Sequence, residues 1–164
     1  MKSLLILRHA KSSWKNQYLT DHDRPLNKRG KRDAPRMGLL LRKEDIVPDL
    51  ILTSSAERAL TTAEAVADAC GFGEEMRVER SFYHGSTSVF CEVLSQLPEE
   101  CSSVLMVGHN PGLENFLEDL IGQWERLPTA SLAYISLPIR SWANFDEEIE
   151  GHLESLWLPR KLPL

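Results

Sequence analysis

Apolar and polar positions along the chain form blocks that predict alternating strands and helices. Short apolar runs at 4–7, 50–53 and 104–107 are typical of strands that are buried on both faces. The segments between these runs carry apolar residues at helical spacing, and the polar stretch 11–26 predicts a loop. We expect the helices at 27–42, 55–70, 87–97 and 112–121, a short strand at 76–79, and two late strands, forming an antiparallel pair, at 132–137 and 153–158.

Single residues mark the expected helix ends. Ser54 or Ser55 predicts an N-cap for the second helix, and Gly71 suits the left-handed position that follows its last turn. Pro111 suits the first turn of the fourth helix. Pro35 lies inside the first helix, where a proline kinks the helix or shifts its start.

This alternation predicts the α/β class, a three-layer sandwich in which helices flank a mainly parallel central sheet. The 164 residues favour one domain that spans residues 1–164. In such folds ligands bind outside the carboxyl ends of the strands. The residues that follow each apolar run are therefore the first place to look for chemistry.

Composition narrows the class of protein. A net charge of −5 argues against general nucleic-acid binding, which needs a basic face. The three cysteines have no metal-ligand or disulfide-framework spacing, so we expect reduced structural thiols. No apolar run is long enough for a membrane span, and the first apolar run is too short for a secretory signal. We expect a monomeric cytoplasmic protein with no membrane or nucleic-acid partner.

Three polar clusters follow three of the apolar runs. Arg8 and His9 come directly after the first run, and His109 follows the run at 104–107. Arg58 lies in the first turn of the helix after 50–53, and helical side chains lean back toward the helix N-terminus. Two arginines and two histidines therefore converge if the strands are neighbours.

These residue types suit a phosphoryl group. Arginine offers a permanent charge and planar donors that match phosphate oxygens, and a neutral imidazole is a competent nucleophile. A lone histidine or arginine is more often a packed or surface residue. The placement of all four at strand ends favours an anion site, but spacing alone leaves the reaction open.

Four segments around these residues resemble the histidine phosphatase superfamily, also called phosphoglycerate mutase-like. They span most of the chain in the family's order, and the short length points to the SixA-type branch of phosphohistidine phosphatases. The matching segments are LRHAKSSW (7–14), DRPLNKRG (23–30), TSSAERALTTAE (53–64) and VGHNPG (107–112).

The resemblance implies that His9 is the catalytic nucleophile and becomes phosphorylated. Arg8, Arg58 and His109 would bind the phosphoryl oxygens, and Ser12 matches a polar neighbour of the phosphate in related mutases. Water would then hydrolyse the phosphohistidine. No cofactor or metal is implied, because the arginines and histidines supply the positive field.

Some positions depart from the family pattern. Ala10 replaces a frequent glycine, Lys15 replaces an asparagine of the mutases, and Asn110 stands where acid phosphatases carry an aspartate. The proton donor is consequently open, with His84 and Glu79 as the candidates. In the family, DHDRPLNKRG lies near the pocket, so its residues Asp21, Asp23 and Arg24 are expected to have a structural role, to order the site or to meet the partner.

The uncertain acid favours a phosphoramidate, whose protonated imidazole leaves more readily than an alkoxide. Only 22 residues separate Gly85 from Gly108, which leaves no room for the large lid insertion of the mutases. An open site suits phosphohistidine on a protein. Two alternatives remain: a phosphatase of small phosphate esters, and a non-catalytic module that binds phosphate.

Overall fold

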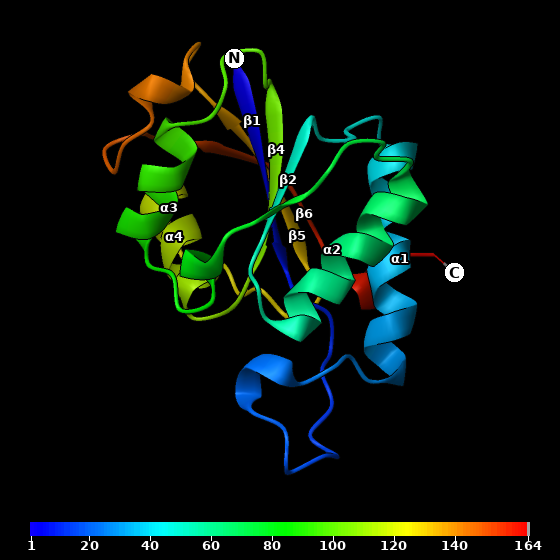
Figure 1. The fold of residues 1–164 in the computed structure, drawn as a ribbon. Helices are drawn as coiled ribbons and strands as arrows, with labels where there is room; N and C mark the ends of the chain where they lie inside the picture. The colour runs from blue at the N-terminus through cyan, green and yellow to red at the C-terminus, as the bar shows by residue number, and fades with distance from the viewer. Residues whose placement is uncertain (164) are drawn as a thin grey trace.

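The computed structural model describes residues 1–163, and its centre is a six-stranded sheet in the order β3-β2-β4-β1-β5-β6 (Figure 1). Its strands follow the predicted apolar runs closely. No helix among the described residues is long and apolar enough to cross a membrane. The strands are β1 (Lys2–Arg8), β2 (Leu50–Thr53), β3 (Arg77–Val78), β4 (Ser103–Gly108), β5 (Leu132–Leu137) and β6 (His152–Trp157).

The sheet is mixed but mainly parallel where the polar clusters lie. β4 pairs in parallel with β1 on one side and with β2 on the other, and β2 pairs in parallel with β3. β5 runs antiparallel to both β1 and β6, which confirms the antiparallel pair expected at the end of the chain. The central strands β1 and β4 are almost fully buried, as uninterrupted apolar runs require.

Four helices form the two outer layers. α1 (Lys28–Lys43) and α2 (Glu57–Cys70) cover one face of the sheet, whereas α3 (Thr87–Ser95) and α4 (Gly112–Ile121) cover the other (Figure 1). Each pair buries its apolar stripe against a separate core, one on each face of the sheet. The predicted three-layer α/β sandwich is confirmed.

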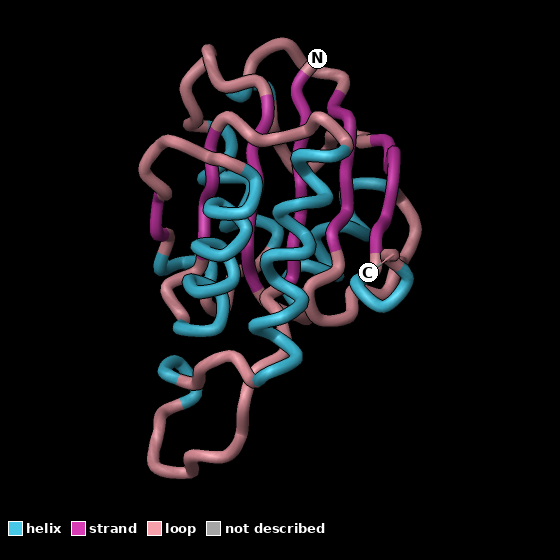
Figure 2. Tube along the Cα trace, turned by 90° about the vertical axis from the view of Figure 1, so that its right-hand side faces the viewer, coloured by secondary structure: helices cyan, strands magenta, loops and turns pink. Residues whose placement is uncertain are grey.

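The segment between β1 and α1 extends beyond the carboxyl edge of the sheet (Figure 2). It contains a short 3-10 turn, η1 (Asp21–Asp23). Gly30 in the first turn of α1 lies so close to this segment that a Cβ atom there would overlap the Lys11 carbonyl oxygen. Chain packing therefore fixes where the segment leaves β1.

Two of the predicted helix ends are wrong. Ala56, not Ser54 or Ser55, is the N-cap of α2, because the Ser54 side chain hydrogen bonds to His109 and the Ser55 side chain to His22. Pro111 is the N-cap of α4 rather than a residue of its first turn. Gly71 does follow α2 in the left-handed conformation, with φ of 77°. Pro35 lies within α1, which begins at Lys28.

Candidate active site

The parallel register brings the three polar clusters to one edge of the sheet. Arg8 at the end of β1 is opposite Gly108 of β4, and Thr53 at the end of β2 is opposite Val107. The rings of His9 and His109, one residue further on, have centroids 5.1 Å apart. The side chains of His9, Arg58 and His109 are all more than nine-tenths buried. The predicted convergence of these residues is therefore present in the structure.

His9 is held as a neutral imidazole. Its Nδ1 lies 2.7 Å from the Ala10 carbonyl oxygen, an acceptor that requires the proton to be on Nδ1. Burial lowers the pKa of His9 to about 4, and the nearby arginines act in the same direction. The Nε2 atom consequently keeps its lone pair at neutral pH, as a nucleophile must.

His109 is oriented by a buried serine. Its Nε2 lies 2.7 Å from Ser54 Oγ, which also accepts a hydrogen bond from the Ala56 amide at 3.2 Å. The Ser54 hydroxyl is then best used as a donor to Nε2, which places the His109 proton on Nδ1. This Nδ1 is buried and has no partner among the described residues. Burial lowers the pKa of His109 to about 3.

Arg8 also has a buried donor without an acceptor. Its Nη1 donates to the Leu127 carbonyl oxygen at 3.1 Å, but its Nε is buried and unpartnered. Asn110 donates to the same carbonyl at 2.8 Å, so the loop at Leu127 is fixed from two sides. Buried polar atoms without a partner are rare, and the described residues contain three such side-chain atoms at this edge of the sheet: the donors Arg8 Nε and His109 Nδ1 and the acceptor Asn110 Oδ1.

Arg58 is fixed by the segment that extends beyond the sheet. Its two terminal nitrogens donate to Asp21, at 2.7 Å to the carbonyl oxygen and at 3.0 Å to the carboxylate. The same carboxylate accepts from Tyr83 at 2.5 Å and from Arg24 at 2.9 Å. The hydrogen bond from Tyr83 and those from the two arginines hold the pKa of Asp21 well below its usual range. Asp21 therefore links Arg24, Arg58 and Tyr83 in one hydrogen-bonded network.

Ser12 lies beside this network. Arg24, itself buried, donates from Nη2 to Ser12 Oγ at 2.5 Å and stacks on the ring of Trp14, with 3.2 Å between the guanidinium carbon and the ring centre. In this structure the Ser12 hydroxyl is thus a partner of Arg24, and it is also buried. Ser12 and Arg24 therefore form one buried hydrogen-bonded pair at this side of the candidate site.

The two candidate proton donors have different surroundings. His84 is exposed and stacks on Tyr83, whose ring in turn meets His109 edge to face at 5.5 Å. Glu79 forms an ion pair with Arg77 at 2.5 Å. His84 lines the cleft beside His109, whereas Glu79 is not among its lining residues. The geometry favours His84.

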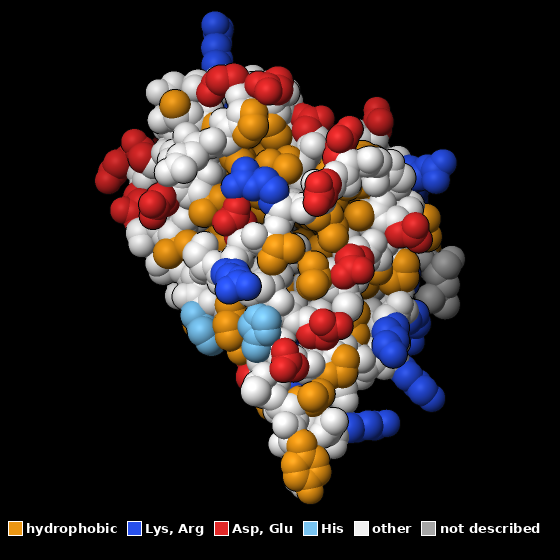
Figure 3. Space-filling view, viewed as in Figure 1, with side chains coloured by type: hydrophobic (Ala, Val, Ile, Leu, Met, Phe, Trp, Pro, Cys, Tyr) orange, Lys and Arg blue, Asp and Glu red, His pale blue; other side chains and the backbone are white. Residues whose placement is uncertain are grey.

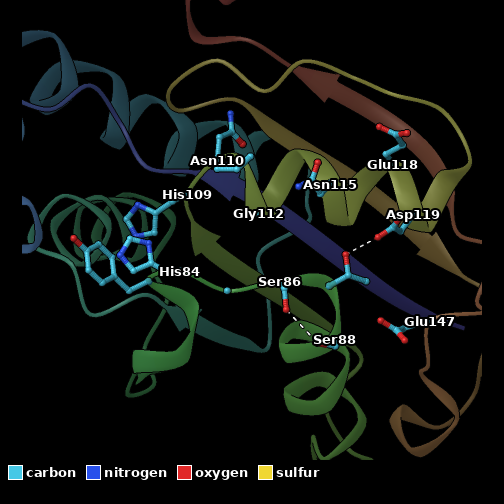
Figure 4. Close-up of a pocket in the computed structure, with 14 residues that line it drawn as sticks. His84, Ser86, Ser88, His109, Asn110, Gly112, Asn115, Glu118, Asp119 and Glu147 are labelled. Atoms are coloured by element: carbon cyan, nitrogen blue, oxygen red, sulfur yellow. Dashed lines mark hydrogen bonds between the residues drawn. The ribbon is translucent and has the colours of Figure 1, made fainter.

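A cleft of about 690 Å³ opens next to these residues (Figure 4). His84 and His109 stand at one end, and the cleft continues past Gly112 and the first turns of α3 and α4. Asp119 and Glu147 stand at the other end. No group of three or more histidine, cysteine or acidic side chains within residues 1–163 is arranged to hold a metal ion.

Three contributors to the site carried weak signals in the sequence. Ser54 resembles an ordinary N-cap serine, although its hydroxyl serves His109. Tyr83 has no local pattern that distinguishes it from a core aromatic residue, and its role follows only from its contact with Asp21. The sequence signal for Asn110 is only its position directly after His109.

Comparisons with known proteins agree with this geometry. The model of the histidine phosphatase superfamily (branch 1) matches residues 4–83, which include His9 and Arg58 but not His109. An uncharacterized chloroplastic protein of Arabidopsis thaliana is 34% identical over 150 residues, which cover 86% of this chain and 69% of the relative. A 2,3-bisphosphoglycerate-dependent phosphoglycerate mutase of Bifidobacterium longum is 40% identical over 68 residues, but these cover only 28% of the mutase.

Solved structures extend the likeness to the whole chain. A crystal structure of SixA from Agrobacterium tumefaciens superposes with a TM-score of 0.82 and 28% identity, covering 96% of this chain and 98% of that one. A protein histidine phosphatase SixA complexed with tungstate has the same fold, with a TM-score of 0.84 over 98% of this chain at 23% identity. The chain belongs to the histidine phosphatase superfamily, and its fold is that of the SixA proteins.

Proposed function

We propose that this protein is a metal-independent phosphatase that acts through a phosphohistidine intermediate on His9, with phosphohistidine on another protein as its substrate. One observation carries the proposal: buried, unpartnered donors on Arg8 and His109 flank a histidine that is held neutral. An oxyanion is the group that satisfies such donors, and a neutral imidazole is the group that attacks phosphorus.

In the first step the His9 Nε2 lone pair attacks the phosphorus atom, and the bond between phosphorus and the substrate imidazole breaks. The leaving imidazole nitrogen keeps the electron pair of that bond and takes a proton, which we propose His84 donates. Arg8, Arg58 and His109 bind the three equatorial oxygens as their charge grows. Removal of one such donor commonly costs on the order of 10²–10³ in rate.

In the second step a water molecule attacks the phosphorus of phospho-His9. The bond to Nε2 breaks, its electron pair returns to His9, and inorganic phosphate leaves. The hydrogen bond from Nδ1–H to the Ala10 carbonyl keeps His9 in the same tautomer through both steps. The low pKa of His9 makes its neutral form the better leaving group in this step.

The lack of a firmly held general acid supports a phosphoramidate substrate over a phosphate ester. An alkoxide needs general-acid help of roughly 10²–10⁴-fold, and His84 is exposed to water rather than held in a fixed hydrogen bond. The open cleft beside His109 also suits a residue presented on a protein surface. A SixA structure with the same fold bears the name protein histidine phosphatase, which supports the same kind of substrate.

The test measures turnover of a protein that carries phosphohistidine and of p-nitrophenyl phosphate, with EDTA present, by the wild type and by His9→Ala. We expect the wild type to prefer the phosphohistidine protein and His9→Ala to be inactive on both. A fully active His9→Ala variant would refute the mechanism. A preference for p-nitrophenyl phosphate would indicate an ester phosphatase, and phosphate binding without turnover would indicate a non-catalytic module.

A further inference from the structure

The cleft beside the catalytic cluster is polarised along its length. At one end it reaches His109, whose neighbourhood contains the guanidinium group of Arg58. At the other end it is lined by the carboxylates of Glu118, Asp119 and Glu147. No lysine or arginine is among its lining residues within the described chain. Figure 4 shows the histidines and these acids at opposite ends.

These acids are available to a ligand. Glu118 and Glu147 are exposed and take part in no ion pair within residues 1–163, whereas Asp119 accepts a hydrogen bond from Thr87 at 2.6 Å. The space-filling view shows acidic side chains along the left edge of the molecule, above the histidines at its lower left (Figure 3). Glu147 and Asp119 also help to raise the pKa of the buried Cys91 thiol to about 11, after burial itself. The field at this end is therefore negative.

The cleft is continuous with the phosphoryl position rather than a separate surface feature. His109 is more than nine-tenths buried, its Nδ1 has no acceptor, and it forms the end wall of the cleft. Gly112 and Asp119 are seven residues apart on α4, which corresponds to about 10 Å along the helix. About three extended residues span the same distance. When a peptide presents its phosphohistidine to His9, the residues within about three positions of the phosphohistidine therefore lie beside the acidic side chains of the cleft.

We propose that this cleft binds the residues that flank the phosphohistidine and selects substrates with a lysine or arginine within about three positions of it. This inference rests on the proposed function and names the kind of protein substrate. A substrate whose second charged group is a carboxylate, such as a phosphoglycerate, meets repulsion in the same cleft.

The test uses three synthetic peptides that carry phosphohistidine. They differ only at the second position before it and the second position after it. Both positions are lysine in one peptide, glutamine in another and glutamate in the third. The wild type is expected to favour the lysine peptide over the glutamate peptide by about tenfold in kcat/KM. This factor corresponds to the summed free energy of two exposed ion pairs, and most of it should be a difference in KM. The preference is expected to decrease as salt is added, because these charges are exposed.

Two matched double variants distinguish an effect of the acids in this cleft from an effect of the protein's net charge. Glu118→Gln combined with Glu147→Gln is expected to abolish most of the preference for the lysine peptide over the glutamate peptide. Glu64→Gln combined with Asp68→Asn removes the same charge from exposed positions of α2, on the other face of the sheet, and is expected to keep the preference. Equal use of the three peptides by the wild type, or a preference that survives in the cleft variant, would overturn the inference.

Binding of the same peptides to His9→Ala separates the two proposals. Turnover without any charge preference would overturn the cleft inference and leave the phosphatase. Tighter binding of the lysine peptide without turnover by the wild type would overturn the phosphatase and leave the cleft as a binding site for basic peptides. Neither turnover nor selective binding would overturn both.

Discussion

The neutral state of His9 has a measurable consequence for stability in acid. In the unfolded chain a histidine takes up its proton near pH 6.5, whereas in the folded protein burial lowers the pKa of His9 to about 4. Between these values the unfolded chain binds more protons than the folded one. The free energy of unfolding therefore falls as the pH decreases from 6.5 to 4, and it does not depend on His9 above pH 7.

The structure sets the size of this effect. The difference between the two pKa values lowers the free energy of unfolding by about 3 kcal/mol below pH 4. At pH 5 the decrease is already about 2 kcal/mol. His9 is only 7% exposed, so water screens little of this cost. Replacing His9 by glutamine removes the proton uptake while keeping a polar side chain of similar length.

The assay is urea unfolding of the wild type and His9→Gln at several pH values from 4.5 to 7.5, in buffers without phosphate. We expect the stability of the variant relative to the wild type to rise by about 2 kcal/mol between pH 7.5 and pH 5. His109 is present in both proteins, and because the charged form of His9 helps to lower the pKa of His109, the difference reports His9 together with this coupling. His152→Gln, which changes an exposed side chain on β6, is the control and should run parallel to the wild type. Parallel curves for His9→Gln and the wild type would refute the account of a buried, neutral nucleophile.

Three further substitutions test the supports of the site. Asp21→Asn should lower kcat/KM in the phosphatase assay by at least about tenfold, because Arg58 loses a charged partner. This loss should be smaller than the loss caused by replacing Arg58 itself. Asp23→Asn, in the same turn, is the control and should retain activity. Ser54→Ala should lower kcat by releasing the orientation of the second histidine, and Ser54→Thr should restore it if the hydroxyl is the cause. Gly30→Ala should lower the free energy of unfolding by about 1–3 kcal/mol in urea melts, because its Cβ would overlap a carbonyl oxygen.

The sequence predicted the fold well wherever one signal acted locally. Continuous apolar runs located β1, β2 and β4, and the predicted bounds of β2 and β5 match the structure. Helix ends were predicted less well because one side chain can serve two purposes. Ser54 has the composition of an N-cap, but its hydroxyl is hydrogen bonded to His109, a residue 55 positions away.

The candidate site shows the same limit. Arg8, His9, Arg58 and His109 follow strands, so the carboxyl edge of the sheet brings them together by a rule that the sequence reveals. Tyr83 and Asp21 meet only because the segment after β1 folds over the end of β2, a contact across 62 residues. No local pattern encodes such a contact, and the same is true of the acids that line the cleft.

Charge balance gives a reason for the position of Asp21 among the arginines of the candidate site. Arg8, Arg24 and Arg58 all act on His9, and without a counter-ion three buried or half-buried guanidinium groups repel one another. The Asp21 carboxylate offsets one of these three positive charges while both histidines are neutral. Asp21 occupies one N–H on each terminal nitrogen of Arg58, so the remaining donors of this guanidinium stay available to phosphoryl oxygens. The carboxylate therefore holds the site together before substrate binds without taking the place of the substrate.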